Sequence, residues 1–247
     1  MRRVPTSSRI RLCLALASLL SVAAGGAQAQ SPRQNSVDRE IMSTSTFMSA
    51  HPDLRFRMLG LHAWEAGDYD TAMAHFRRGA RYADKPSQGM VAEMLWNGQG
   101  TPVDRPLAHA WMQVAAEREY KVMVINRDRY WSEMDAAERQ RALALAPAIA
   151  AEYGDAAAKP RVERKMRQVR NSSTGSRTGF TGNLRIILPS PHGDVTVDGS
   201  QFFEDRFWKP DEYWAWQEDD WKELPKGRVK VGPLEGNKAP APATPAK

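Results

Sequence analysis

The stretch SQGMVAEMLWNGQGTPVDRPLAHAWMQVAA, residues 87–116, decides the fold. It predicts two short helices joined by a loop, because Gly98 and Gly100 permit a wide turn between segments whose apolar residues recur at helical spacing. Asp104 is placed to cap the second helix. Residues 54–83 repeat the order of helix, glycine turn and helix, so the chain contains a supersecondary unit of roughly 34 residues more than once.

The earlier unit carries its own turn signal. Gly67 supplies a turn conformation that other residues resist, and Asp68 can accept a hydrogen bond from the exposed amides of the following helix. Small and aromatic residues then stand where they let two helices approach and fill the space between them. The unit resembles a tetratricopeptide-type repeat in its packing positions: Phe56, Leu59, Gly60, Gly67, Asp68, Tyr69, Ala72 and Phe76.

Residues 87–116 resemble a second family more closely. The spacing of the following residues is similar to that of Sel-one-like repeats, which are tetratricopeptide-like helical repeats with a longer internal loop: Leu95, Gly98, Gly100, Asp104, Ala108, Trp111, Ala115 and Ala116. Leu95 departs from the tyrosine usual in that family. The resemblance implies a short helical-hairpin solenoid of a secreted bacterial type, whose concave face binds a peptide or a partner domain.

These patterns predict a mainly α fold with a small C-terminal β-containing module. Within the repeat domain we expect hairpins at about 53–83 and 87–119 and capping helices at about 120–153, the second of which begins with the capping-box pair Asp135 and Glu138. The predicted organisation is a signal peptide over 1–29, a flexible leader over 30–51, a helical repeat domain over 52–155, a basic helix and linker over 156–182, a Trp-rich β-containing module over 183–235 and a disordered tail over 236–247.

The N-terminus indicates export. A basic start, an apolar run over residues 12–24 and the small-residue pattern Ala27-Gln28-Ala29 describe a secretory signal peptide, and that run is too short to span a bilayer. We therefore expect a periplasmic or secreted protein with no transmembrane segment. Cleavage would remove the only cysteine, Cys13, and leave 31 of the 35 basic residues against 29 acidic ones, so nucleic acid is not an expected partner.

The C-terminal third changes character twice. Residues 156–170 form a basic segment with a thin apolar stripe, which suits either a linking helix with a solvated charged face or a helix that meets an anionic polymer. Residues 184–188 and 195–197 read as two short strands with a turn between them. An aromatic, acidic segment follows at residues 206–225, and residues 228–231 have the pattern of one more strand.

No constellation for catalysis is visible. The histidines lack the i, i+4 pairing of a zinc site, there is no Gly-x-Ser-x-Gly motif, and the mature chain has no thiol. An enzymatic interpretation would depend on carboxylates of the aromatic segment, as in sugar hydrolysis: Asp211, Glu212, Glu218 and Asp219. We expect no catalytic residues, no metal and no cofactor, and hence no enzyme.

Two functions remain. The first is a protein–protein interaction scaffold or adaptor of the bacterial cell envelope, in which the first helix of each hairpin offers partner contacts: Arg57, His62, Glu93 and Asn97. The alternative is a protein that binds peptidoglycan or an anionic envelope polymer, with tryptophans that stack on glycans: Trp208, Trp214, Trp216 and Trp221.

Overall fold

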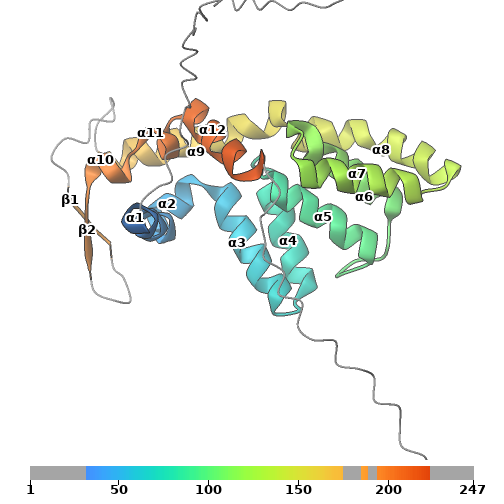
Figure 1. Cartoon of the computed structure of the whole chain (residues 1–247), viewed down its shortest axis with the longest axis horizontal. Coiled ribbons are helices and arrows are strands. Elements are labelled where there is room, and N and C mark those ends of the chain that lie inside the picture. Colours follow the sequence, from blue (N-terminus) through green and yellow to red (C-terminus); the bar gives the residue numbers. More distant parts are fainter. Residues whose placement is uncertain (1–31, 175–184, 189–193, 223–247) are drawn as a thin grey trace, which may run out of the picture.

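Helices make up most of the chain in the computed structural model, which describes residues 32–174, 185–188 and 194–222 (Figure 1). The predicted mainly α class with a small β component is confirmed, since the described residues also form an antiparallel sheet of two strands. The expected signal peptide, the tail over 236–247 and the strand pattern at 228–231 lie outside the described residues.

The first helical hairpin joins α3 (Pro52–Glu65) to α4 (Tyr69–Ala80). Gly60 is essential to their close approach, because a Cβ at this position would lie 2.6 Å from the ring of Phe76. Phe76 and Ala72 are fully buried, whereas Leu59 is half-buried. Asp68 caps α4 by accepting a hydrogen bond of 3.1 Å from the amide of Thr71.

The second hairpin joins α5 (Lys85–Asn97) to α6 (Arg105–Ala115), which a short 3-10 turn (Ala116–Arg118) extends. Gly98 ends α5 with φ +71°, and Gly100 has φ +64°, so both adopt the left-handed backbone that glycine tolerates. Asp104 caps α6 by accepting from the amide of Leu107 at 3.1 Å. The residues placed at packing positions are buried as predicted: Leu95, Ala108, Trp111, Ala115 and Ala116.

Two further helices pack against α6: α7 (Lys121–Glu133) and α8 (Ala136–Tyr153). The capping box is present, because the Asp135 carboxylate accepts from the amide of Glu138 at 2.8 Å and the Glu138 carboxylate accepts from the amide of Asp135 at 3.0 Å. Pro147 lies inside α8, which is one continuous helix.

The part of the expected flexible leader that the structure describes, residues 32–51, is mostly helical and packed. It forms α1 (Pro32–Ser43) and α2 (Ser45–Ala50), and Ile41, Phe47 and Ala50 are fully buried. The prediction was wrong because the apolar surface that covers these side chains comes from far along the chain. Phe47 meets the ring of Phe207 edge to face with centroids 5.4 Å apart.

Helix α9 (Asp155–Thr174) has an exposed charged face, but its other face belongs to the core, so the helix does not merely link two parts of the chain. Its stripe of Ala158, Val162 and Met166 is fully buried and packs in one cluster with Tyr213 and Trp214. The helix also contacts α2, α3, α8 and α11, so it runs beside both ends of the described chain (Figure 1).

The expected separate C-terminal module is instead part of the same body. Strands β1 (Arg185–Leu188) and β2 (Val195–Asp198) pair antiparallel, as the sequence predicts. The aromatic segment that follows is helical: α10 (Gly199–Phe202), α11 (Asp205–Trp208) and α12 (Pro210–Lys222). Its aromatic side chains share a hydrophobic cluster with α1 and α2, which joins the leader to the C-terminal segment.

Candidate functional site

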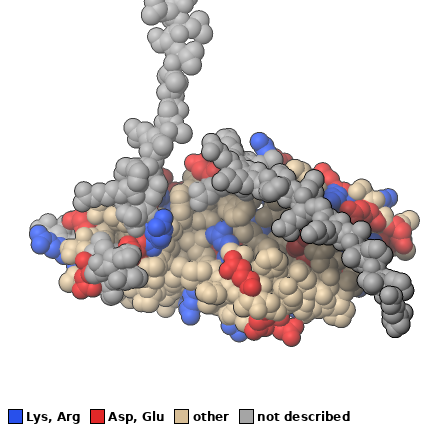
Figure 2. Space-filling model, turned by 60° about the horizontal axis from the view of Figure 1, so that its bottom comes forward, with Lys and Arg blue, Asp and Glu red and all other residues tan. Residues whose placement is uncertain are grey.

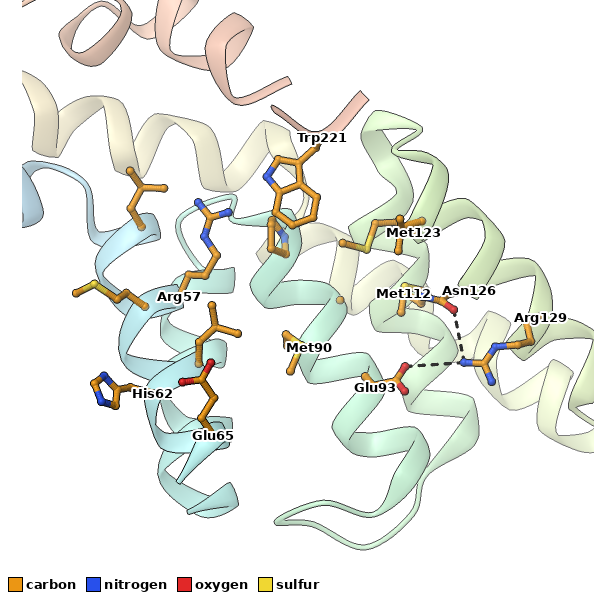
Figure 3. A pocket seen from close by; sticks show the side chains of 16 residues that line it. Arg57, His62, Glu65, Met90, Glu93, Met112, Met123, Asn126, Arg129 and Trp221 are labelled. Atoms are coloured by element: carbon orange, nitrogen blue, oxygen red, sulfur yellow. Dashed lines mark hydrogen bonds and ion pairs between the residues drawn. The ribbon is translucent and has the colours of Figure 1, made fainter. Parts of the chain in front are cut away.

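A groove opens between α3, α5 and α7, and Trp221 of α12 lies at one end of it (Figure 3). The groove has a volume of about 790 Å³ and is lined mainly by apolar side chains. Those that come from α3, α5, α6 and α7 are Leu54, Met58, Leu61, Pro86, Met90, Met112, Val122 and Met123. A groove of this size with an apolar lining and few polar groups is typical of a binding site.

Helix α3 has two apolar sides, of which only one is covered by α4. One side carries Gly60 and packs on α4, while Leu54, Met58 and Leu61 recur at i, i+4 and i+7 on another side and line the groove. Met58 is 49% exposed and Leu61 is 40% exposed, which is unusual for large apolar side chains that follow one another along a helix. The described chain therefore leaves an apolar stripe of α3 without cover.

The lining is rich in methionine. Met58, Met90, Met112 and Met123 come from α3, α5, α6 and α7 in turn. A methionine side chain is unbranched and polarizable, so the exposed Met58 and the half-buried Met90 can adapt to ligands of different shape, whereas Met112 and Met123 are almost fully buried. This composition suits the recognition of apolar side chains more than the precise placement of a reacting group.

Charged side chains of both signs lie around the apolar lining. Arg57 lies near the Trp221 end, with its guanidinium 5.9 Å from the Trp221 ring centroid and its Nε 3.5 Å from a carboxylate oxygen of Asp84. Glu65 and Glu93 lie toward the other end (Figure 3). Glu65 is exposed and has no ion-pair partner among the described residues.

Glu93 is held in place by its neighbours. Its carboxylate accepts hydrogen bonds from the Tyr130 hydroxyl at 2.5 Å and from the Asn97 side-chain amide at 2.8 Å, and Arg129 lies 3.9 Å away. Burial of the Tyr130 ring, together with its bond to Glu93, raises the pKa of that hydroxyl, so it stays a donor at neutral pH. One acidic group of the groove is thus fixed in direction.

The structure brings together most of the residues expected to contact a partner. Arg57, His62 and Glu93 all line the groove, whereas Asn97 does not line it and acts on it through its bond to Glu93. The methionines and Trp221 were missed as groove residues. The stripe of residues 54, 58 and 61 was a sequence signal for them, but the same residues could equally have been assigned to the hairpin interior.

The tryptophans of the alternative function do not form one surface. Trp208 is 2% exposed and its indole N–H donates to the carbonyl oxygen of Phe202 at 2.7 Å. Trp214 is 7% exposed, and the charged groups of Arg118 and Lys159 lie 4.8 and 5.1 Å from its ring centroid. Trp216 packs on Phe207 with ring centroids 5.3 Å apart. Stacking on a sugar needs an open ring face, which Trp208 and Trp214 do not offer.

The carboxylates of the aromatic segment are spread around α12. Asp211, Glu212 and Asp219 are exposed and Glu218 is half-buried, and none of them lines the groove. The described residues contain no group of three or more side chains with the geometry to hold a metal ion. The face of the molecule in Figure 2 is largely uncharged between scattered acidic and basic groups.

A buried polar centre joins the start of α3 to α12. The Tyr213 hydroxyl donates to the carboxyl of Asp53, which is 2% exposed. Burial raises the pKa of Asp53 to about 7, an effect that the Tyr213 bond opposes and the neighbouring Asp84 strengthens. In the same core, burial lowers the pKa of His51 to about 4, although its ring nitrogens lie 2.9 and 2.7 Å from the carbonyl oxygens of Phe47 and Phe207.

A buried ion network joins the start of α5 to the start of α9. Lys85 is fully buried, and its ammonium group lies 2.7 Å from Glu117 and 2.9 Å from Asp155, which also pairs with Arg118 at 2.7 Å. Burial acts to raise the pKa of Asp155, but the bond from Arg118 and the charge of Lys85 hold it well below its usual range. The network fixes where α9 leaves α8.

Comparison of the chain with models of protein families, with curated proteins and with solved structures found no match. Among the described residues, no helix is both long and apolar enough to cross a membrane. The groove is therefore interpreted from its own geometry and chemistry.

Proposed function

We propose that this chain is a non-enzymatic protein–protein interaction scaffold of the bacterial cell envelope, and that the groove between α3, α5 and α7 binds a peptide segment of its partner. The observation that carries the proposal is the exposed apolar stripe of α3, which together with Met90 and Met123 makes a groove of about 790 Å³. The Sel-one-like resemblance supports the same use of the first helix in each hairpin.

The lining defines the chemistry of the peptide. Apolar side chains of the peptide would bury the exposed surface of Met58 and Leu61, at a gain of about 25 cal/mol for each Å² removed from water. Glu65, which has no ion-pair partner among the described residues, favours a basic residue at the end of the groove away from Trp221, whereas Glu93 already has Arg129 beside it. We therefore expect a peptide with two or more large apolar residues followed or preceded by lysine or arginine.

The cell-envelope location in this proposal rests on the N-terminal export pattern. The scaffold architecture is supported by the two hairpins with their glycine turns and their Asp68 and Asp104 caps. It is also supported by the resemblance of their sequence spacing to short helical repeats. A glycan-binding function has less support, because its stacking residues Trp208 and Trp214 are buried in packing contacts.

The proposal can be tested by selecting peptides from a displayed random library against the purified chain from residue 30 onward. Selected peptides should share apolar residues with a nearby basic residue. The variant Met58→Glu places a carboxylate on the groove lining at a position that is already 49% exposed, so it should fold normally and weaken these peptides by about tenfold or more.

Leu143→Glu is a matched control. Leu143 lies on α8, is 57% exposed and does not line the groove. This variant therefore introduces the same charge at a similarly exposed helical position outside the groove. Retained binding in Leu143→Glu with loss in Met58→Glu would support the groove. If both variants bind the selected peptides as the parent chain does, or if no apolar consensus emerges, the proposal is wrong.

A further inference from the structure

The cationic side chains of helix α9 differ in whether they have a carboxylate partner. Lys159 pairs with Asp155 at 3.3 Å and Arg167 lies 3.9 Å from Glu163, so both have a carboxylate on their own helix. Arg164 and Lys165 are exposed and have no carboxylate partner among the described residues. Two neighbouring cations without a carboxylate partner are a candidate for binding an anion from outside the chain.

These cations line a pocket of about 380 Å³ between the end of α4 and the middle of α9. Its lining consists of Arg81, Tyr82, Arg161, Arg164, Lys165 and Gln168. Apart from the oxygens of Tyr82 and Gln168, the side chains can only donate hydrogen bonds. The pocket shares no lining residue with the groove between α3, α5 and α7, so the two sites are independent.

Part of the pocket is preorganised. One guanidinium nitrogen of Arg161 donates to the carbonyl oxygens of Arg81 at 3.0 Å and Glu152 at 2.7 Å, which fixes this side chain against the ends of α4 and α8. The carboxylate of Glu152 pairs with Arg81 at 2.8 Å. The cations that line the pocket thus outnumber the one carboxylate that pairs with any of them.

We propose that this pocket binds the phosphate groups of a phosphate-bearing anion, either a soluble oligophosphate or the headgroup of an anionic lipid. Guanidinium groups match phosphate oxygens with paired hydrogen bonds, and Lys165 adds a point charge. Arg161 and Gln168 are seven residues apart, a rise of roughly 10 Å along the helix. That length accommodates more than one phosphate, which favours a multiply charged ligand over a single carboxylate.

The surroundings favour the soluble source. None of the large apolar side chains that are exposed in the described chain lines this pocket, so nothing beside it would enter a lipid bilayer. A vesicle would be bound through charge alone. Both sources present the same chemistry to Arg161, Arg164 and Lys165, and the experiment separates them.

The test is calorimetric titration of the chain from residue 30 onward with inorganic pyrophosphate at about 100 mM salt, where screening suppresses weak contacts between exposed charges. We expect saturable binding that Arg164→Gln and Lys165→Gln each weaken by about fivefold or more, because each removes one charge-assisted contact. Arg167→Gln is the matched control. It removes one exposed cation from the same helix outside the pocket, and binding should change less than twofold.

A second arm measures cosedimentation with phosphatidylcholine vesicles that contain phosphatidylglycerol. Pyrophosphate binding without cosedimentation supports a soluble phosphate ligand. Cosedimentation that Arg164→Gln reduces and Arg167→Gln preserves supports a lipid headgroup. The inference is overturned if neither probe binds, or if Arg164→Gln and Arg167→Gln reduce binding equally. Neither result bears on peptide binding in the groove, because the sites share no residue.

Discussion

Replacing Asp53 by asparagine should change how the stability of the fold depends on pH. Asp53 lies at the start of α3 with 2% exposure and accepts a hydrogen bond from the Tyr213 hydroxyl of α12. Its charged surroundings are Asp84, which disfavours ionisation, and Arg57, which favours it. Asparagine keeps an oxygen that can accept from Tyr213 and removes the titration.

The expected sign follows from the raised pKa. Asp53 titrates near 3.8 in the unfolded chain and at about 7 in the folded chain, so the folded state holds the proton more tightly between these values. The free energy of unfolding therefore falls as pH rises from about 4 to about 7. A difference of roughly three pH units corresponds to a loss of at most about 4 kcal/mol, at 1.4 kcal/mol for each unit.

His51 should act in the opposite direction in the same pH range. Its pKa is lowered from 6.5 to about 4 in the folded chain, so the unfolded chain binds the proton more tightly and stability is lost as pH falls from about 6.5 to 4. The shift of roughly two and a half pH units corresponds to about 3 kcal/mol. The contributions of Asp53 and His51 to the pH dependence of stability therefore oppose each other in the parent chain.

Urea unfolding followed by tryptophan fluorescence between pH 4.5 and 8 would reveal the contributions of both residues to stability. Relative to the parent chain, Asp53→Asn should gain stability progressively as pH rises, and His51→Gln should gain stability progressively as pH falls. Each variant is compared with the parent chain at every pH, which removes the contribution of other groups. If the difference between Asp53→Asn and the parent chain is the same at pH 5 and pH 7.5, the assignment of a raised pKa to Asp53 is refuted.

Other predictions concern packing. Gly60→Ala should lower the free energy of unfolding by about 1–3 kcal/mol, measured by urea unfolding, since the added methyl group would lie 2.6 Å from the Phe76 ring. Lys85→Met should cost about 1–3 kcal/mol in the same assay, because it removes the buried cation that pairs with Glu117 and Asp155, while Arg118 still pairs with Asp155. A chain that begins at residue 52 should expose Trp208, which fluorescence quenching by iodide would detect as increased access.

The middle of the fold could be predicted from the sequence because its signals are local. Asp68, Asp104 and Asp135 each accept a hydrogen bond from the backbone amide three residues later. Each helix cap can therefore be predicted from a few neighbouring residues. Gly98 and Gly100 have the positive φ that their place in the loop requires. The helices between residues 52 and 153 follow from these boundaries.

The two ends of the described chain could not be predicted in the same way. Phe47 and Phe207 are far apart in sequence but pack together. The short segments that contain them have too few regularly spaced apolar residues to indicate which part of the chain covers them. The polar composition of residues 30–51 suggested flexibility because composition averages over the few side chains that are buried. The burial of Lys85 could not be predicted either, because a lysine is normally exposed and its ion-pair partners lie on other elements.

The groove illustrates why site residues were harder to predict than packing residues. In α3, the side chains that pack on α4 and those that line the groove are all apolar, so hydrophobicity alone cannot divide them. Which apolar side chains of α3 line the groove depends on where α5 and α7 lie. The positions of these helices depend in turn on Gly60, Gly89 and the Lys85 network. Gly89 shows this dependence directly, because a Cβ there would lie 2.8 Å from the sulfur of Met123 in the groove lining. The shape of the groove is therefore a property of the assembled hairpins, and substitutions at Gly60 or Lys85, which do not line the groove, should change its ligands by altering the spacing of the helices.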